Sequence, residues 1–530
     1  MPTSIAISNL SWSTPDGHPL LSELNLTLGP ERTGLVGRNG VGKTTLLKLI
    51  SGERKPRSGT ISFAGSLGVL RQVVQVTAEE TVADLMGATE ALDVLRRAEL
   101  GEATADEFAA ADWMLEARIA ATLARVGLDA EPDTKLSALS GGQRTRAGLA
   151  ALVLAEPDFL VLDEPTNNLD RDGRQAVIDL LADWRSGAVV VSHDRELLET
   201  VDAIVELTSL GAARYGGNWS SYRERKSLEL AAAQHDLADA EKRVADLARN
   251  AQVVAERKAR KDGAGKRKAA KGDAPRIVLG GMKERSEATS GEDARLAERR
   301  RTQALGDANA ARARIEVIQP LSVKLAPTNL PAGRTVLKID GVAAGYHPDR
   351  PIFTDLSLDM TGPERVAIVG PNGSGKTTLL ALITRRLQPF TGTVSTVADL
   401  AMLDQQVSIL DAGLSIRDNF RRLNQQSDEN ACRAALARFM FRADAALQSV
   451  STLSGGQLLR AGLACVLGGS SPPSLLILDE PTNHLDIDSI AAVEAGLRAY
   501  DGALLVVSHD EVFLDAIGIT RRIELPLTGA

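Results

Sequence analysis

The chain of 530 residues is too long for a single hydrophobic core, so its length predicts two or three domains. Its 44% hydrophobic and 25% charged residues are typical of a water-soluble globular protein, and the net charge of −8 argues against a general affinity for nucleic acids. The two cysteines form neither a metal-ligand set nor a disulfide framework, and no apolar run approaches about 18 residues, so we expect a cytoplasmic protein without a membrane span.

Four short motifs occur twice and in the same order. They are GRNGVGKT at 37–44 and GPNGSGKT at 370–377, LSGGQ at 139–143 and 453–457, FLVLDEPTNNLD at 159–170 and LLILDEPTNHLD at 475–486, and VVVSHD at 189–194 and LVVSHD at 505–510. The offset between copies falls from 333 residues at the first motif to 314 at LSGGQ, which predicts about 19 extra residues within 80–125. The chain therefore contains an internal duplication of one unit.

Apolar runs such as LLILD and LLVVS, separated by helical stretches, predict buried parallel strands in an α/β domain. The glycine-rich motif GxxxxGK[ST] forms a loop whose backbone N–H groups surround phosphates at the start of a helix. Lys43 and Lys376 would reach the β- and γ-phosphates, and the hydroxyls of Thr44 and Thr377 would bind Mg²⁺. On its own the motif also fits a plain glycine-rich turn.

A carboxylate pair ends an apolar strand in each copy, as Asp163–Glu164 and Asp479–Glu480. The aspartate is suited to the Mg²⁺ shell, and the glutamate to orienting or deprotonating the attacking water. An acidic strand end that caps the next helix is the alternative, and the PTN-x-LD that follows in both copies argues against it.

LSGGQ places a serine and two glycines at a predicted helix N-terminus, which suits an anion as well as a simple N-cap. With this motif the sequence resembles the ATP-binding cassette superfamily, in which the signature of one cassette closes over the γ-phosphate held by the other. The resemblance implies two shared ATP sites. Site one would contain Gly37, Asn39, Gly40, Gly42, Lys43, Thr44 and Thr45 with Ser454, Gly455, Gly456 and Gln457; site two would contain Gly370, Asn372, Gly373, Gly375, Lys376, Thr377 and Thr378 with Ser140, Gly141, Gly142 and Gln143.

The same resemblance assigns further roles. Gln72 and Gln405 match the glutamines that contact Mg²⁺, so the expected metal ligands are Thr44, Gln72, Asp163, Thr377, Gln405 and Asp479. His193 and His509 match the γ-phosphate-sensing histidines and join Glu164 and Glu480 as catalytic residues, while Asp170 and Asp486 match the loop that couples the sites.

The two copies depart from each other at two places. Tyr346 stands where the superfamily stacks an aromatic ring on adenine, but the first copy has Thr14 there, with Trp12 as a substitute or as a packing residue. Asn168 stands where the second copy has His484. Unequal sites are thus one expectation, although both keep their catalytic groups.

The connector begins with YGGNWSSYRERK at 215–226 and continues with heptad spacing at Leu230, Ala233, Leu237, Ala240, Val244, Leu247, Ala251 and Val254. A second seam contains Ala297, Ala304, Ala308, Ala311, Ile315 and Ile318. Between them, 257–276 carries nine basic residues against two aspartates: Arg257, Lys258, Arg260, Lys261, Lys266, Arg267, Lys268, Lys271 and Arg276. These residues, Arg276 aside, are the candidate RNA contacts, with a solvated loop as the alternative.

Two cassettes and this connector resemble the ABC-F family over nearly the whole chain. The resemblance implies two P-loop cassette domains at 1–222 and 330–530, joined by an antiparallel helical hairpin at 223–329. It also implies a small arm within 80–125, and a Mg²⁺-dependent ATPase that needs no partner chain for its ATP sites. Family members bind the ribosome near the tRNA exit site when ATP is bound, contact ribosomal RNA and tRNA, and leave on hydrolysis. They modulate translation or protect ribosomes against antibiotics.

Two other classes compete with this interpretation. A fused ATPase subunit of a membrane transporter would use the same cassettes but has no role for the basic hairpin. A DNA-repair or chromosome-type ATPase would need a much longer coiled coil or zinc-binding cysteines, and the two cysteines and a connector of about 100 residues disfavour it.

Overall fold

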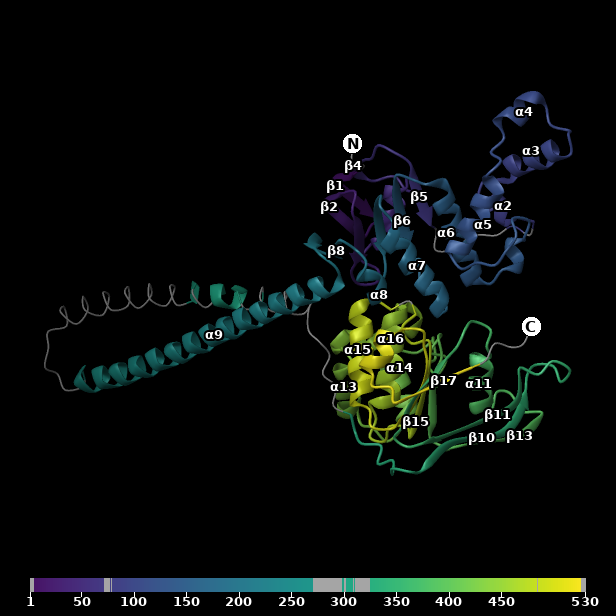
Figure 1. The fold of residues 1–530 in the computed structure, drawn as a ribbon. Helices are drawn as coiled ribbons and strands as arrows, with labels where there is room; N and C mark the ends of the chain where they lie inside the picture. The colour runs from purple at the N-terminus through teal and green to yellow at the C-terminus, as the bar shows by residue number, and fades with distance from the viewer. Residues whose placement is uncertain are drawn as a thin grey trace. The chain divides into compact units, whose positions relative to one another are not determined.

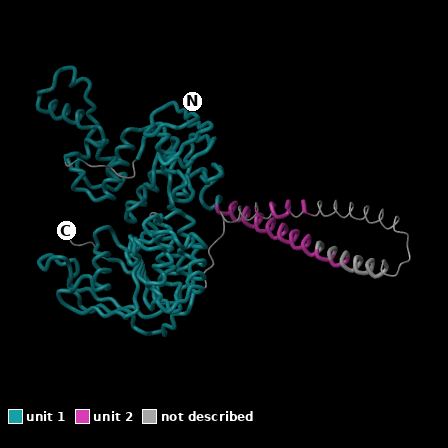
Figure 2. The backbone as a smooth tube through the Cα atoms, turned by 180° about the vertical axis from the view of Figure 1, so that it is seen from behind, with its two compact units in different colours: residues 1–222, 321–530 teal, residues 223–320 magenta. Residues whose placement is uncertain are grey.

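A computed structural model describes residues 4–70, 77, 79–269, 298–299, 302–307, 309, 325–483 and 485–525, without the side chains of 250–251, 254–255 and 258–269. The chain forms two compact units, coloured separately in Figure 2. Met1–Tyr222 and Leu321–Ala530 make up the first, and Arg223–Pro320 the second. The predicted domain bounds of 1–222, 223–329 and 330–530, and the arm within 80–125, stay predictions.

The first half of the chain builds one mixed sheet and one small antiparallel sheet (Figure 1). In the six-stranded sheet the order is β5-β6-β7-β3-β8-β9, and in the three-stranded sheet it is β2-β1-β4. The strands are β1 (Ile5–Ser13), β2 (Pro19–Leu28), β3 (Arg32–Val36), β4 (Ser58–Ser62), β5 (Leu67–Leu70), β6 (Phe159–Asp163), β7 (Gly187–Val191), β8 (Ala203–Thr208) and β9 (Gly211–Gly216). The helices are α1 (Lys43–Ile50), α2 (Val82–Leu85), α3 (Thr89–Glu99), α4 (Ala105–Ala110), α5 (Leu115–Arg125), η1 (Leu136–Ala138), α6 (Gly141–Ala155), α7 (Arg171–Asp183) and α8 (Arg195–Leu198).

The second half repeats this plan with a five-stranded sheet, β14-β15-β16-β12-β17, and an antiparallel sheet, β11-β10-β13. Its strands are β10 (Thr335–Ala344), β11 (Phe353–Thr361), β12 (Arg365–Val369), β13 (Thr391–Thr396), β14 (Leu400–Leu403), β15 (Leu475–Asp479), β16 (Ala503–Val507) and β17 (Arg521–Glu524). Its helices are α11 (Lys376–Ile383), α12 (Ile416–Leu423), α13 (Glu429–Arg438), η2 (Ala443–Leu447), η3 (Val450–Thr452), α14 (Gly455–Leu467), α15 (Ile487–Ala499) and α16 (Glu511–Ala516). The LLILD run is β15 and pairs in parallel with β16, so the predicted buried parallel strands are confirmed.

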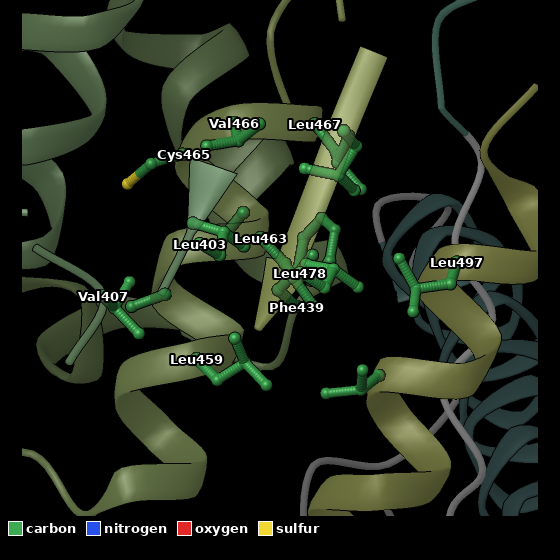
Figure 3. Close-up of a cluster of buried hydrophobic side chains, with 14 of the residues drawn as sticks. Leu403, Val407, Phe439, Leu459, Leu463, Cys465, Val466, Leu467, Leu478 and Leu497 are labelled. Carbon is green, nitrogen blue, oxygen red and sulfur yellow. The ribbon is translucent and has the colours of Figure 1, made fainter. Parts of the chain in front are cut away.

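Both faces of the main sheet are covered in the second half, which explains its unbroken apolar strands. Leu476 and Leu478 of β15 point into a core formed with α14 and α15, shown in Figure 3, and Ile477 joins the core on the other face with α11. Each fully buried leucine contributes roughly 1.5–3 kcal/mol. This packing holds the ends of β15 and β16, where the motif residues lie.

The chain leaves the first cassette through an aromatic cluster. Tyr215, Trp219 and Tyr222 are buried against Val36, Leu198, Val201 and Ile204. The Tyr215 and Tyr222 rings meet edge to face with centroids 5.1 Å apart. The aromatic motif at the exit therefore anchors the first turn of the long helix α9 (Trp219–Ala269) in the first unit.

Within the second unit, α9 shows the predicted heptad seam. Ala233 and Ala240 are buried, and Leu230, Leu237, Val244 and Leu247 are half-buried between exposed positions. Residues 302–307 are also helical, with Ala304 buried. The remaining predicted seam positions lie outside the described side chains: Ala251, Val254, Ala297, Ala308, Ala311, Ile315 and Ile318.

Candidate ATP sites

Each glycine-rich motif forms a loop that ends in a helix without a side-chain cap. Gly42 and Gly375 stand at the N-caps of α1 and α11 in left-handed conformations, with φ of 111° and 94°. A Cβ on Gly37, at φ 147°, would lie 2.3 Å from the Leu207 carbonyl oxygen, so only glycine fits there. The first N–H groups of both helices are thus free of side-chain caps, which is the arrangement that binds phosphate.

The two predicted lysines fold over their loops in the same way. Lys43 Nζ donates to the carbonyls of Gly37 and Arg38 at 2.6 and 3.1 Å, and Lys376 Nζ donates to those of Gly370 and Pro371 at 2.7 and 3.0 Å. Burial lowers the pKa of both ammonium groups, and the nearby carboxylates oppose that shift. Both cations are therefore held at the mouth of the loop where phosphates would enter.

The strand-end glutamates sit in a strained turn that the sequence did not reveal. Glu164 and Glu480 adopt left-handed backbones, with φ of 49° and 48°. Their N–H groups donate to Val191 and Val507 of the neighbouring strands at 2.9 and 2.8 Å. Such a conformation costs on the order of 1–3 kcal/mol, and the neighbouring strand is what holds it.

Each glutamate faces the predicted histidine of its own cassette. His193 Nε2 lies 3.1 Å from Glu164 Oε1, and His509 Nε2 lies 3.4 Å from Glu480 Oε1. Burial raises the pKa of both glutamates to about 8. Burial also lowers the pKa of His193 to about 3 and that of His509 to about 4, with the phosphate-loop lysine adding to the shift in each case. A glutamate of raised pKa beside a neutral imidazole suits general-base chemistry.

The predicted Mg²⁺ ligands are partly brought together. The Thr44 hydroxyl donates to the Asp163 carboxylate, whose Oδ1 has no hydrogen-bond partner among the described residues although it is buried. An acidic oxygen left free beside a threonine hydroxyl fits a hard cation. In the second cassette, Thr377 is exposed and Asp479 is half-buried, while Gln405 lines a cavity between the cassettes. Gln72 lies outside the described residues.

The LSGGQ motifs begin helices as the sequence predicted. Ser140 and Gln143 form a capping box on α6, and Ser454 and Gln457 form one on α14. In each box the glutamine side chain accepts from the serine N–H, at 2.8 and 2.9 Å. These boxes orient the two glycines of each LSGGQ motif. The serine and glutamine side chains form hydrogen bonds within their own helix start.

The two cassettes meet head to tail within the first unit. The Asn39 N–H of the first phosphate loop donates to Asp486 at 2.7 Å, and the Asn372 N–H of the second donates to Asp170 at 3.4 Å. The Asn372 side chain also donates to the Asn168 carbonyl at 3.2 Å. Each phosphate loop is therefore in contact with the loop that precedes α7 or α15 of the opposite cassette.

The signature of the first cassette also lies at the opposite cassette's phosphate loop, in site two. A Cβ on Gly142 would lie 3.3 Å from the Asn168 carbonyl and 3.8 Å from the Asn372 side chain, so α6 begins beside the second phosphate loop. Gly456 lies against Ser489 of its own cassette. Site two thus brings together residues that lie far apart in the sequence.

A cavity of about 480 Å³ opens over the first phosphate loop. Thr14 lines it together with Asn39, Lys43, Asp163 and His193. Trp12 instead packs on the Arg54 guanidinium, 4.9 Å from the ring centroid, and against the core beneath β1 and β2. Tyr346 of the second cassette is 64% exposed and free to meet a ligand.

Motif reasoning missed two arginines that cross between the cassettes. Arg174 of α7 donates to the His509 carbonyl. Arg195 of α8 pairs with Glu494 of α15 at 2.7 Å, and the side chains of Arg195 and Glu494 are each less than 10% exposed. Neither arginine lies in one of the duplicated motifs whose residues were given a chemical role from the sequence. Arg195 directly follows VSHD, which was the one local signal available.

The predicted RNA-binding residues are mostly beyond what the structure describes. Arg257 is exposed on α9. Lys271 lies outside the described residues, as do the side chains of Lys258, Arg260, Lys261, Lys266, Arg267 and Lys268. Their role stays a prediction.

Known proteins resemble this chain over nearly its full length. The family described as "ABC transporter" matches residues 21–167 and 353–483. The "Tylosin resistance ATP-binding protein TlrC" of Streptomyces fradiae is 32% identical over 93% of this chain and 92% of its own length. The "Energy-dependent translational throttle protein EttA" of Mycobacterium tuberculosis is 30% identical over 94% of this chain and 87% of its own.

A solved structure shares the fold. It is titled "Crystal structure of the complex of archaeal ribosomal stalk protein aP1 and archaeal ribosome recycling factor aABCE1" and matches with a TM-score of 0.60 at 17% identity, covering 98% of this chain and 87% of that one. Within the described part of the chain, no helix has the length and apolar character needed to cross a bilayer. The tandem α/β cassette architecture predicted from the motifs is confirmed.

Proposed function

Because the chain belongs to the ABC-F family of the ATP-binding cassette superfamily, we propose that it is a Mg²⁺-dependent ATPase whose ATP-bound form docks on the ribosome. Docking would be near the tRNA exit site, and hydrolysis would release the protein. The observation that carries this function is the head-to-tail contact of each phosphate loop with the opposite cassette, through Asn39–Asp486 and Asn372–Asp170. ATP bound there would join the two cassettes.

Binding rests on residues that the two halves supply together. The uncapped N–H groups of α1 and α11 would receive phosphate oxygens, and Lys43 and Lys376 would exchange their carbonyl partners for the β- and γ-phosphates. The capping boxes hold Gly141 and Gly142, or Gly455 and Gly456, with their N–H groups directed out of the helix start.

Thr44 and Asp163 fit a Mg²⁺ ion in site one, and Thr377 and Asp479 are their counterparts in site two. Gln72 and Gln405 would complete the two sets. When bound with ATP, the ion neutralises charge on the β- and γ-phosphates.

Glu164 and Glu480 would take the proton of the attacking water or hold that water in line. Their pKa of about 8 makes them stronger bases than an exposed glutamate. His193 and His509, kept neutral by burial, would donate one hydrogen bond to the γ-phosphate while adding no charge that competes with the lysine.

The ribosomal role draws on the relatives and on the connector. One relative is named as a translational throttle, which favours translation over the fused-transporter alternative, and another is named for tylosin resistance, which favours a role in antibiotic resistance. The basic residues at 257–276 would contact ribosomal RNA and tRNA through phosphates, with a strong dependence on salt. We accordingly place the protein in the cytoplasm and include ribosome protection against antibiotics among its roles.

Sedimentation tests this function. The Glu164→Gln, Glu480→Gln double variant should bind ATP without hydrolysing it, so with ATP it should sediment with ribosomes, and without ATP it should not. The matched control adds Lys43→Ala and Lys376→Ala, which should abolish sedimentation. Changing Lys258, Lys261, Lys266 and Lys268 to Gln should weaken it and flatten its salt dependence. A trapped, ATP-loaded protein that stays wholly ribosome-free contradicts the ribosomal role.

A further inference from the structure

One buried arginine joins the catalytic loops of both cassettes. The Arg174 side chain is 11% exposed and pairs with Asp194 through Nε at 3.0 Å and Nη2 at 2.8 Å. Its Nη1 donates across the cassette boundary to the backbone carbonyl of His509. Asp194 directly follows His193, so a single guanidinium contacts the loops of both predicted γ-phosphate sensors.

The position lies at the centre of the paired cassettes. A cavity of about 210 Å³ is lined by Arg174 together with both catalytic pairs, Glu164 with His193 and Glu480 with His509. Burying a guanidinium is favourable only when its donors are satisfied in good geometry, and breaking such a contact is costly. The Asp194 pair and the His509 carbonyl supply that satisfaction here.

The duplicated half does not repeat this contact. Arg174 stands four residues after Asp170, and the equivalent position after Asp486 is Ile490. Ile490 is 2% exposed, belongs to the second cassette's core and lines the same cavity. An isoleucine has no donor for a carbonyl of the His193 loop. The second cassette instead reaches the His193 loop through an ion pair, between Glu494 of α15 and Arg195 at 2.7 Å. The first cassette alone has an arginine at this position to hold the backbone of the opposite histidine loop.

The contact lies next to the catalytic pair of site two. His509 stands 3.4 Å from Glu480, a looser pair than the 3.1 Å of His193 and Glu164. A hydrogen bond to the His509 carbonyl fixes the backbone from which this imidazole projects. Both histidine loops also have support within their own cassettes, because Asp194 accepts from the N–H groups of Glu196 and Leu197 at 3.1 and 3.3 Å and Asp510 accepts from that of Phe513 at 2.9 Å. The bond from Arg174 is what the His509 loop has in addition.

We propose that Arg174 is a positioning residue by which the first cassette sets His509 for hydrolysis in site two, so that site two depends on Arg174 more than site one does. The inference rests on the ATP hydrolysis proposed above and adds a direction to the coupling of the two sites.

The test isolates each site in the full chain. Glu164→Gln leaves site two active, and Glu480→Gln leaves site one active. Arg174→Ile is then introduced into each background, because isoleucine is the residue at the equivalent position of the second half, Ile490. Steady-state ATP hydrolysis gives kcat and KM. Arg171→Ala is the matched control, because Arg171 lies on the same helix and also crosses to the second cassette, 3.7 Å from Glu511, but its side chain is 76% exposed.

We expect Arg174→Ile to lower kcat of site two by about 10- to 100-fold, as misplacing a catalytic group by about 1 Å does, with KM changed less than about 2-fold. Site one should lose at least about 3-fold less than site two, because its His193 loop loses the Arg174–Asp194 pair but keeps the Arg195–Glu494 contact with the second cassette. Arg171→Ala should leave both sites close to their parents. Arg174→Lys should restore part of the loss, since an ammonium can reach one of the two partners.

Equal losses in both backgrounds, a change in KM alone, or no loss in site two would overturn the inference. If Arg174→Ile does not fold, Arg174→Lys decides, because it keeps the buried charge. A partial loss that is larger in site two than in site one supports the inference, and any other pattern contradicts it. If the Glu164→Gln variant has no ATPase activity before Arg174 is changed, both the proposed hydrolysis at two sites and this inference are contradicted. If that variant is active and Arg174→Ile does not change its activity, only this inference is contradicted.

Discussion

In the first ATP site, the Asn39 N–H of the phosphate loop reaches the opposite cassette's Asp486 over 2.7 Å, whereas in the second the equivalent bond from Asn372 to Asp170 is 3.4 Å long. The glutamate–histidine pair is likewise closer in the first site, 3.1 Å against 3.4 Å. The groups that perform chemistry are duplicated, and most contacts that hold them are duplicated too but differ in length. Duplication therefore preserved two sites and left the contacts around them free to diverge.

The adenine end shows the same divergence. Thr14 lines the first cavity and Tyr346 is exposed at the corresponding place of the second cassette, while Trp12 is engaged with Arg54. The structure favours the packing interpretation of Trp12 over its use as a base-stacking residue. Unequal sites stay an expectation from the sequence, and these residues are where the two sites differ.

The largest effect is expected when the catalytic glutamate, which both sites have, is removed from each. We expect the Glu164→Gln, Glu480→Gln double variant to lose at least about 100-fold in ATP hydrolysis, because each site loses its base. Each single variant should retain the activity of the other site. Phosphate release measures this, with the exposed Glu102→Gln as control. Full activity in either single variant would show that the site it silences contributes nothing.

A smaller effect should separate the two cross-cassette contacts. Asp486 and Asp170 both cap a helix, α15 and α7, so alanine at either position carries a similar stability cost of about 0.5–2 kcal/mol. Asp486 makes the shorter bond, so Asp486→Ala should lower hydrolysis at site one by about 10-fold, and Asp170→Ala should lower that at site two less. The reverse order, measured in the single-site backgrounds, would show that the two distances do not govern function.

The adenine position should give an effect of a few fold. Tyr346→Ala should raise the KM for ATP at site two by about 3- to 10-fold, in keeping with about 0.5–1.5 kcal/mol for an aromatic contact. Thr14→Tyr should lower KM at site one by a similar factor. Trp12→Phe is the control and should leave KM unchanged, and a large change there would restore Trp12 as a base contact.

The smallest effect concerns stability without nucleotide. Burial raises the pKa of Glu164 and Glu480 from 4.5 to about 8, so the folded state binds their protons more tightly than the unfolded state. Their contribution to stability is full below pH 4.5 and is lost as pH rises through about 8. Glutamine does not ionise, so the double variant should melt a few degrees above the parent at pH 8, with a smaller gap at pH 5. A gap that widens toward acid would contradict the shift.

The sequence predicted what local physics determines. Apolar runs predicted β15 and β16, LSGGQ predicted the starts of α6 and α14, and heptad spacing predicted the buried Ala233 and Ala240. Each is a short-range pattern whose meaning depends on neighbours in the chain. The fold and most of the candidate site follow from such patterns.

The contacts between the halves could not be predicted in this way. Arg174 and His509 are 335 residues apart, and no motif position marks the arginine as special. The left-handed turn at Glu164 was hidden for a similar reason, since it depends on the bond to Val191 of a neighbouring strand. Comparing the two copies position by position, Arg174 against Ile490, is the signal that would have found the asymmetry.

The central claim, two complete ATP sites formed by the pairing of the cassettes, is tested most directly by counting trapped nucleotide. Radiolabelled ATP is bound to the Glu164→Gln, Glu480→Gln variant with Mg²⁺, and free ATP is removed by rapid gel filtration. Two ATP molecules per monomeric chain are predicted, falling to one with Lys43→Ala or Lys376→Ala. A single ATP per chain before those lysine changes would contradict the claim.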